Sequence, residues 1–149
     1  MAVVWAKQAG SWTATTLWAF WNETTQQIED YGQVPQLGDV VYCNGYTITM
    51  NTNNINIGNG TIRNDINPYT NISGGFLTSP NNANTLTCNL YAYNSEVLRL
   101  TSNSSQTLTI NGNLTADDSN LNYIINKTGN DAFRIIVTGN ITANNCDVF

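Results

Sequence analysis

The residue types that enzymes use most often for proton transfer and nucleophilic attack are scarce in this sequence. There is no histidine, which excludes the serine–histidine–aspartate triad and most zinc sites. A cysteine nucleophile would lack its usual imidazole base. The cysteines, Cys43, Cys88 and Cys146, are odd in number and widely spaced, which suits neither a disulfide framework nor a zinc site. We therefore predict free thiols, with Cys88 in the hydrophobic core.

The adjacent carboxylates Asp117 and Asp118 are the best candidates for acid–base chemistry. Polysaccharide hydrolysis requires two such groups on one face, about 5–9 Å apart. This pair, however, falls at an expected corner of the chain, and the internal repeat described below places Asn144 and Asn145 at the same position. A preference for turns explains both dipeptides. We expect no catalytic residues and predict that the protein is not an enzyme.

Metal and nucleotide sites find equally little support. A calcium site would draw its oxygen ligands from Asp117, Asp118 or Asp131, but their spacing matches no known calcium-binding loop. The glycine-rich segment 58–61 lacks the lysine of a phosphate-binding loop. We predict that the protein binds no metal ion and no cofactor.

Large aromatic residues carry the strongest functional signal. The first 38 residues hold a cluster of five: Trp5, Trp12, Trp18, Phe20 and Trp21. Two interpretations stay open. The cluster covers the first layer of strands, whose core and edges would otherwise be exposed, or it inserts into a partner protein, because tryptophan is enriched in binding hot spots. All five residues therefore form a candidate partner interface.

The charge of the chain limits its partners. Lys and Arg number 5 and Asp and Glu number 10, which gives a net charge of −5. Binding a nucleic-acid backbone requires clustered basic residues, so we expect no nucleic-acid partner. The longest apolar cluster, residues 17–21, is too short to span a membrane, and the first residues lack the pattern of a signal peptide. We expect folding in the cytoplasm and no membrane contact.

The strongest structural signal is an internal repeat at an offset of 27 residues, between residues 107–118 and 134–145. Glycine, asparagine, threonine and alanine recur at identical places, and Leu108 is matched by Ile135. Apolar residues alternate with polar ones in each copy, which is the period of a strand with one buried face. One copy cannot bury its apolar face alone, so we expect neighbouring copies to stack and share one core. Weaker copies occur at 46–50 and 85–90.

The repeat predicts an all-β protein in the form of a right-handed parallel β-helix, with three short strands in each coil and Gly or Asn at the corners. The alternative is an antiparallel β-sandwich, whose strands recur at similar intervals. The predicted strands are 40–43, 47–50, 54–57, 61–64, 76–78, 86–90, 97–101, 108–110, 114–116, 122–125, 134–137 and 141–143.

The chain divides into two parts of different texture. Residues 1–38 form a Trp-rich segment that caps or anchors the molecule, and residues 39–149 form the predicted β-helix domain. Residues 18–28 resemble a short helix, but the many threonines nearby oppose it, and we predict loop and strand with one helical turn. The segment 65–75 interrupts the repeat as a long loop.

One stretch resembles the opening of β-helical virion proteins of tailed bacteriophages. There the pattern P-x-x-G-D-x-V-Y-x-N-G-x-T-x-T-I leads into the first coil; here residues 35–50 read PQLGDVVYCNGYTITM. A later G-G-F-T element corresponds to GGFLT at residues 74–78. Over about residues 1–90 the chain is similar to head fibre or decoration proteins of phages of gut Bacteroidetes, including crAss-like phages.

This resemblance implies a structural protein of the virion, with the N-terminal segment docked on capsid proteins and the β-helix projecting from the capsid surface. It also implies a homo-oligomer, either trimer or dimer, assembled in the host cytoplasm. The alternative is a carbohydrate-binding adhesin, or a fragment of a tail spike or tail fibre, that recognises the host surface. Such a protein would stack sugars on exposed aromatic residues such as Tyr91 and Tyr93.

Overall fold

The computed structural model describes residues 1–79, 83–101, 106–117, 125–128 and 133–144, and it is all-β. The described elements are β1 (Val3–Ala6), β2 (Gly10–Ser11), the 3₁₀ turn η1 (Thr15–Leu17), β3 (Trp18–Asn22), β4 (Gln27–Asp30), β5 (Val40–Tyr42), β6 (Thr47–Thr49), β7 (Asn54–Arg63), β8 (Phe76–Ser79), β9 (Ala83–Tyr93), β10 (Leu98–Leu100), β11 (Gln106–Ile110), β12 (Leu114–Asp117), β13 (Ile125–Lys127), β14 (Phe133–Val137) and β15 (Ile141–Asn144).

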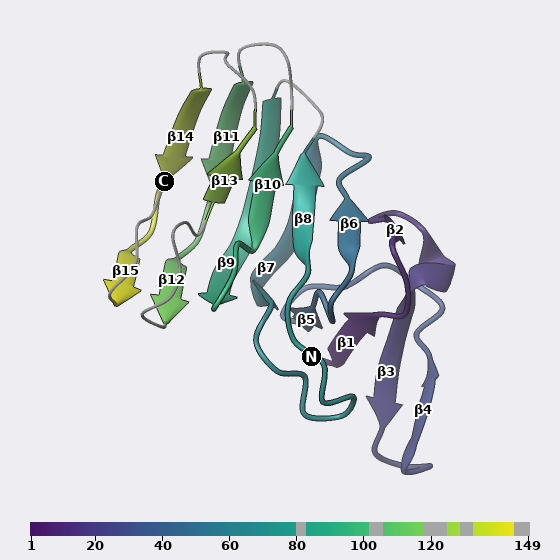
Figure 1. Ribbon diagram of the computed structural model, residues 1–149. Coiled ribbons are helices and arrows are strands. Elements are labelled where there is room, and N and C mark those ends of the chain that lie inside the picture. The colour runs from purple at the N-terminus through teal and green to yellow at the C-terminus, as the bar shows by residue number, and fades with distance from the viewer. Residues whose placement is uncertain (80–82, 102–105, 118–124, 129–132, 145–149) are drawn as a thin grey trace.

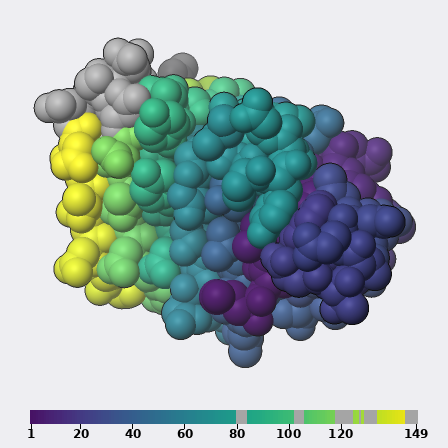
Figure 2. Space-filling model, turned by 90° about the horizontal axis from the view of Figure 1, so that it is seen from below, coloured from purple at the N-terminus to yellow at the C-terminus, as the bar shows by residue number. Residues whose placement is uncertain are grey.

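These strands form two sheets (Figure 1): the larger has mixed pairing, and the described pairs of the smaller are all parallel. The larger has the order β14-β11-β9-β7-β5-β1-β3-β4, with β12 pairing to β9 and β15. The smaller has the order β13-β10-β8-β6-β2. Among the described strands, β1–β3 and β3–β4 pair antiparallel and the other pairs are parallel. The molecule therefore extends from the N-terminal segment at one end to β15 at the other (Figure 2).

Most predicted strands from residue 40 onward are confirmed. The predicted strands 54–57 and 61–64 are in fact one strand, β7, with a register irregularity between Asn56 and Thr61. Of the predicted strand 122–125, residues 122–124 lie outside the described residues, and β13 begins at Ile125. Each end of the other strands agrees to within three residues.

The two copies of the repeat lie side by side in parallel register, as predicted. Leu108 is paired with Ile135 across β11 and β14, and Leu114 with Ile141 across β12 and β15. The earlier copy in β9 continues the same alignment, because Leu90 is paired with Leu114. Residues with equivalent places in the sequence therefore occupy equivalent places in adjacent strands, roughly 4.8 Å apart.

Recurring asparagines and glycines hold the corners between strands. The main-chain N–H of Asn140 donates to Oδ1 of Asn113 (2.9 Å), whose own N–H donates to Oδ1 of Asn89 (3.0 Å). A Cβ on Gly112 would overlap the main-chain oxygen of Cys88. These contacts explain why the corner residues recur in both copies.

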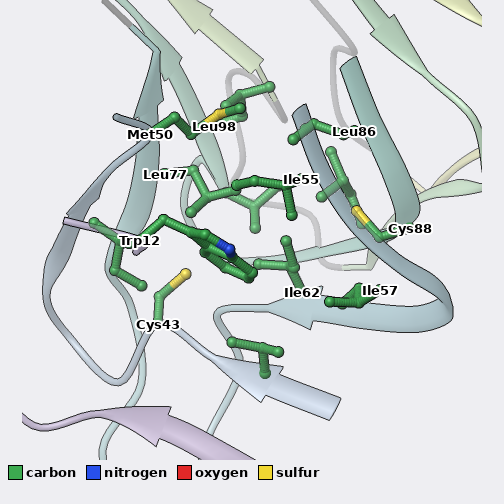
Figure 3. Packing of buried hydrophobic residues seen from close by; sticks show 14 of the residues in the cluster. Trp12, Cys43, Met50, Ile55, Ile57, Ile62, Leu77, Leu86, Cys88 and Leu98 are labelled. Atoms are coloured by element: carbon green, nitrogen blue, oxygen red, sulfur yellow. The ribbon is translucent and has the colours of Figure 1, made fainter. Parts of the chain in front are cut away.

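Apolar side chains from the two sheets point toward one another and form the core (Figure 3). Ile62 and Leu86 come from the larger sheet, and Leu77 and Leu98 come from the smaller one. Cys88 is buried among them, as predicted.

The N-terminal segment continues both sheets. β1 pairs with β5, and β2 pairs with β6. The region from 18 to 28 is a hairpin of β3 and β4 rather than a helix, and the helical turn lies just before it in η1. β3 is rich in aromatic residues, which favour strand, and Thr24 and Thr25 lie in the turn that joins β3 to β4.

A buried carboxylate fixes the connection from this segment into β5. Asp39 accepts hydrogen bonds from the N–H of Ala2 (2.7 Å), the N–H of Gln36 (2.8 Å) and the hydroxyl of Tyr31 (2.7 Å). Gly38 precedes it with φ +84°, a conformation that favours glycine. The Gly-Asp pair of the opening motif thus turns the chain into β5. Within the described residues, the structure contains no helix of the length and apolar character needed to cross a membrane.

Candidate functional site

The five residues of the predicted partner interface differ in burial. Trp5, Trp12 and Trp18 are 2%, 4% and 0% exposed, whereas Phe20 and Trp21 remain partly exposed. The first three contact other parts of this chain in the folded state. A partner could therefore reach only Phe20 and Trp21 without a change in conformation.

Trp12 and Trp18 close one end of the core. Their rings meet edge to face with centroids 5.1 Å apart and planes at 68°, and Trp18 Nε1 donates to the main-chain oxygen of Trp12 (3.2 Å). Trp12 points into the core toward the region of Cys43 and Leu77 (Figure 3). This position fits the covering interpretation for both tryptophans.

Trp5 lies on the opposite, outer face of the larger sheet, because its neighbours Val4 and Ala6 point into the core. Tyr69 covers it, with ring centroids 5.7 Å apart and planes at 18°. Tyr69 also stacks on Trp21 at 5.4 Å and 16°. The tyrosine ring thus contacts two indoles from different strands, β1 and β3.

The loop that carries Tyr69 is anchored through a buried asparagine. Oδ1 of Asn44 accepts hydrogen bonds from Asn67 Nδ2 (3.2 Å) and Thr70 Oγ1 (2.5 Å), and its Nδ2 donates to the main-chain oxygen of Ala6 (3.1 Å). Asn44 has φ 57°, which asparagine tolerates better than most residues. The loop predicted at 65–75 therefore attaches the N-terminal segment to the rest of the sheet.

The outer face continues from Trp5 across three more strands. Trp5 is paired with Tyr42, Tyr42 with Arg63, and Arg63 with Tyr91. The Arg63 guanidinium lies 5.2 Å from the ring centroid of Tyr42 and 4.7 Å from that of Tyr91. We refer to this set as the aromatic row; its members are Trp21, Tyr69, Trp5, Tyr42, Arg63 and Tyr91.

The carboxylate of Asp65, next to the aromatic row, compensates the charge of Arg63. Its Nε donates to Asp65 Oδ1 (2.6 Å) and its Nη2 donates to Asp65 Oδ2. This bidentate hydrogen bond raises the pKa of the guanidinium. Burial raises the pKa of Tyr42, and burial followed by the charge of Asp117 raises that of Tyr91. Both phenols therefore keep their protons at neutral pH. Because Asp65 compensates Arg63, the aromatic row carries little net charge from Trp21 to Tyr91.

The row ends at Tyr91 on β9. Tyr93 of the same strand and Thr115 and Asp117 of β12 lie beside it, and we call these four residues the exposed end of the row. Tyr91 and Tyr93 point outward, since Leu90 and Ala92, which alternate with them along β9, are buried. Asp117 is exposed and paired with Tyr93, and its Oδ2 accepts from the Tyr91 hydroxyl at 3.3 Å. Tyr93 is 37% exposed. These groups present ring faces and hydrogen-bonding oxygens on one open surface.

The residues considered for catalysis and metal binding are only partly placed. Asp117 lies at the end of β12, whereas Asp118, Asp131 and Cys146 lie outside the described residues. In the part of the chain that the structure describes, no group of three or more His, Cys, Asp or Glu side chains is arranged to hold a metal ion. Burial raises the pKa of the Cys43 thiol to about 12, which opposes formation of a reactive thiolate.

Sequence reasoning named Trp5, Trp21 and Tyr91 as candidate binding residues and missed the other half of the aromatic row, Tyr42, Arg63 and Tyr69. Tyr42, Arg63 and Tyr91 recur at unequal spacings because the loops between their strands differ in length, so no period connects them. Tyr69 lies in the loop outside the repeat. The available signal was their outward position in each alternating segment, which predicts a shared face once the strands are aligned.

Comparison of the chain with protein-family models, with curated proteins and with solved structures gives no significant match.

Proposed function

We propose that this chain is a structural protein of a bacteriophage virion, a capsid-attached head fibre or decoration protein, rather than an enzyme. In this proposal its strands form the coils of a right-handed parallel β-helix, and the chain works as a homo-oligomer, trimer or dimer, on the capsid surface. The observation that carries it is the parallel, in-register stacking of the repeat from β9 to β15. Such stacking makes a stiff, elongated body in which each strand supports its neighbours.

The N-terminal segment provides the proposed attachment surface for the capsid. The exposed part of the predicted interface lies on the β3–β4 hairpin, where Trp21 is paired with Ile28. Ile28 is 52% exposed, and Phe20 on the other face packs on Tyr31 with ring centroids 5.6 Å apart. β4 is the terminal strand of the larger sheet, so its outer edge is open to pairing with a strand of a partner.

A surface substitution tests attachment without removing the segment. Deleting residues 1–38 would uncover Val41 and Ile48, which pack against it, and would confuse misfolding with loss of docking. Ile28→Asp instead places a charge at the centre of the exposed hairpin face. Ile141→Asp is the matched control, since Ile141 is 46% exposed on β15 at the opposite end.

The assay is co-sedimentation of purified chain with capsids of the parent phage that lack it. The proposal predicts that the wild type and Ile141→Asp sediment with capsids and that Ile28→Asp loses at least 10-fold in bound protein. Equal binding of both variants would contradict the anchor. Failure of the wild-type chain to bind, or its absence from purified virions by mass spectrometry, would contradict the virion function.

A second candidate function is recognition of a host-surface glycan, as in an adhesin or a tail-spike or tail-fibre fragment. The observation that favours it is the exposed end of the aromatic row, where Tyr91 and Tyr93 lie beside Asp117. Ring faces next to hydrogen-bonding carboxylates suit sugars, which present apolar C–H faces and polar rims. The two functions use different surfaces, and one protein can carry both.

A further inference from the structure

We infer that the exposed end of the aromatic row is a binding site for an uncharged, hydroxyl-rich polysaccharide. This inference rests on the glycan-recognition function proposed above and adds to it the chemical class of the ligand. The site consists of Tyr91 and Tyr93 on β9 with Thr115 and Asp117 on β12.

The spacing of the two rings fits a surface that receives an extended ligand. Tyr91 and Tyr93 are two residues apart on one strand, so their Cα atoms are separated by roughly 6.5–7 Å along the strand. Across the sheet, Thr115 is paired with Tyr91 and Asp117 with Tyr93. All four side chains face outward, because Leu114 and Ala116 point into the core. The result is an open platform of two rings, one hydroxyl and one carboxylate.

The platform is fixed before any ligand binds. Tyr91 has the Arg63 guanidinium against its ring and its hydroxyl on Asp117. The main-chain N–H of Tyr93 donates to Oδ1 of Asn64 (2.8 Å), a buried residue whose Nδ2 donates to the main-chain oxygens of Ser95 and Glu96. The Tyr91 side chain and the Tyr93 main chain therefore have little freedom to lose on binding, which favours affinity from a small contact area.

The charges around the platform select against acidic sugars. The cation at this site is Arg63, and Asp65 neutralises it through both carboxylate oxygens. Asp117 adds an exposed acidic side chain beside Tyr91 and Tyr93. A uronate, sialate or sulfated sugar would bring a negative charge close to the Asp117 carboxylate. Electrostatic repulsion between the two charges disfavours binding, and this repulsion grows as water is excluded and the local dielectric constant falls. A neutral sugar, in contrast, can donate hydroxyl hydrogen bonds to Asp117 while its C–H face lies on Tyr93.

The test is affinity electrophoresis of the purified full chain in gels that contain one polysaccharide each. The neutral probes are dextran, galactomannan, arabinoxylan and mannan; the acidic probes are polygalacturonate and alginate. Tyr93→Ala removes the exposed ring, and Leu37→Ala is the matched control, an exposed apolar residue that belongs to neither proposed surface. Near-ultraviolet circular dichroism of each variant checks that the fold is retained.

The inference predicts that at least one neutral polysaccharide retards the wild type and Leu37→Ala, and that Tyr93→Ala weakens this retardation at least 10-fold. Neither acidic polysaccharide is expected to retard the chain. Retardation by acidic probes alone that is lost in Tyr93→Ala would overturn the ligand class but leave glycan recognition standing. Retardation by no probe would overturn both, and neutral binding that Tyr93→Ala leaves unchanged would overturn the location of the site.

Discussion

Tyr69 stacks on Trp5 across the outer face of the larger sheet, with ring centroids 5.7 Å apart and planes at 18°. The same ring also stacks on Trp21. The loop and the N-terminal segment are far apart in the sequence, and these two stacked contacts join them.

Tyr69→Ala should destabilise the protein by roughly 1–3 kcal/mol, because two stacked aromatic pairs are each worth about 0.5–1.5 kcal/mol beyond their buried area. Urea unfolding measures the loss. The tryptophan emission maximum of the folded variant should shift to longer wavelength, since Trp5 becomes exposed to water. Tyr69→Phe keeps the ring and should change neither quantity; a large effect of Tyr69→Phe would mean that the hydroxyl rather than stacking matters.

Asp39→Ala should cost roughly 3 kcal/mol. The substitution leaves the N–H groups of Ala2 and Gln36 without their acceptor, and charge-assisted hydrogen bonds that fix a turn are among the stronger ones. The free energy of unfolding in urea is the measurement. Asp30→Asn is the control, because Asp30 is exposed and its carboxylate forms a surface ion pair with Lys7. Similar stability of the two variants would contradict the structural role given to Asp39.

Gly112→Ala should destabilise the stack by about 1–3 kcal/mol or more, because its Cβ would overlap the main-chain oxygen of Cys88 in the neighbouring strand. Asn111→Ala, at the adjacent exposed position, should change the thermal midpoint by little. Equal effects of the two substitutions on the thermal midpoint would contradict the close approach of Gly112 to the main chain of Cys88.

Stability should fall at alkaline pH because of two buried thiols. Burial raises the pKa of Cys43 and of Cys88 from 9.0 to about 12. Above pH 9 unfolded thiols release protons that the folded state retains, so the unfolded state binds fewer protons and the free energy of unfolding decreases as pH rises toward 12. Below pH 9 both states are protonated and this contribution to stability is complete.

The double variant Cys43→Ala, Cys88→Ala should therefore lose less stability between pH 8 and pH 10.5 than the wild type, although it starts lower because of the volume removed. Urea titrations at both pH values give the comparison. Tyr31, whose pKa burial and the hydrogen bond to Asp39 raise to about 12, is unchanged in the variant. An identical loss in both proteins would show that the thiols do not control the alkaline response.

The repeat made the strands and their register predictable. Alternation places Leu108 and Ile110 inward, and a shift of the register by one residue would turn every apolar side chain outward. The recurring Gly and Asn residues then show which positions of the two copies correspond. The pairing of Leu108 with Ile135 follows from these two constraints alone.

The N-terminal segment and its aromatic contacts were less predictable for a physical reason. A strand with Val4 and Ala6 inward places Trp5 outward, and alternation alone would leave it exposed. It is buried only because a loop more than 60 residues later in the chain brings Tyr69 over it. No local pattern records such a contact, so neither the burial of Trp5 nor the course of the aromatic row could be read from the sequence.

The parallel alignment of repeat copies is the claim on which the fold and the proposed glycan-binding surface depend. The most direct test is a carbon-edited nuclear Overhauser spectrum of the isotope-labelled protein. The structure predicts methyl cross-peaks between Leu108 and Ile135 and between Ile110 and Val137. Missing methyl cross-peaks, together with close Hα–Hα contacts between β11 and β12, would indicate a hairpin of sequential strands and contradict the account.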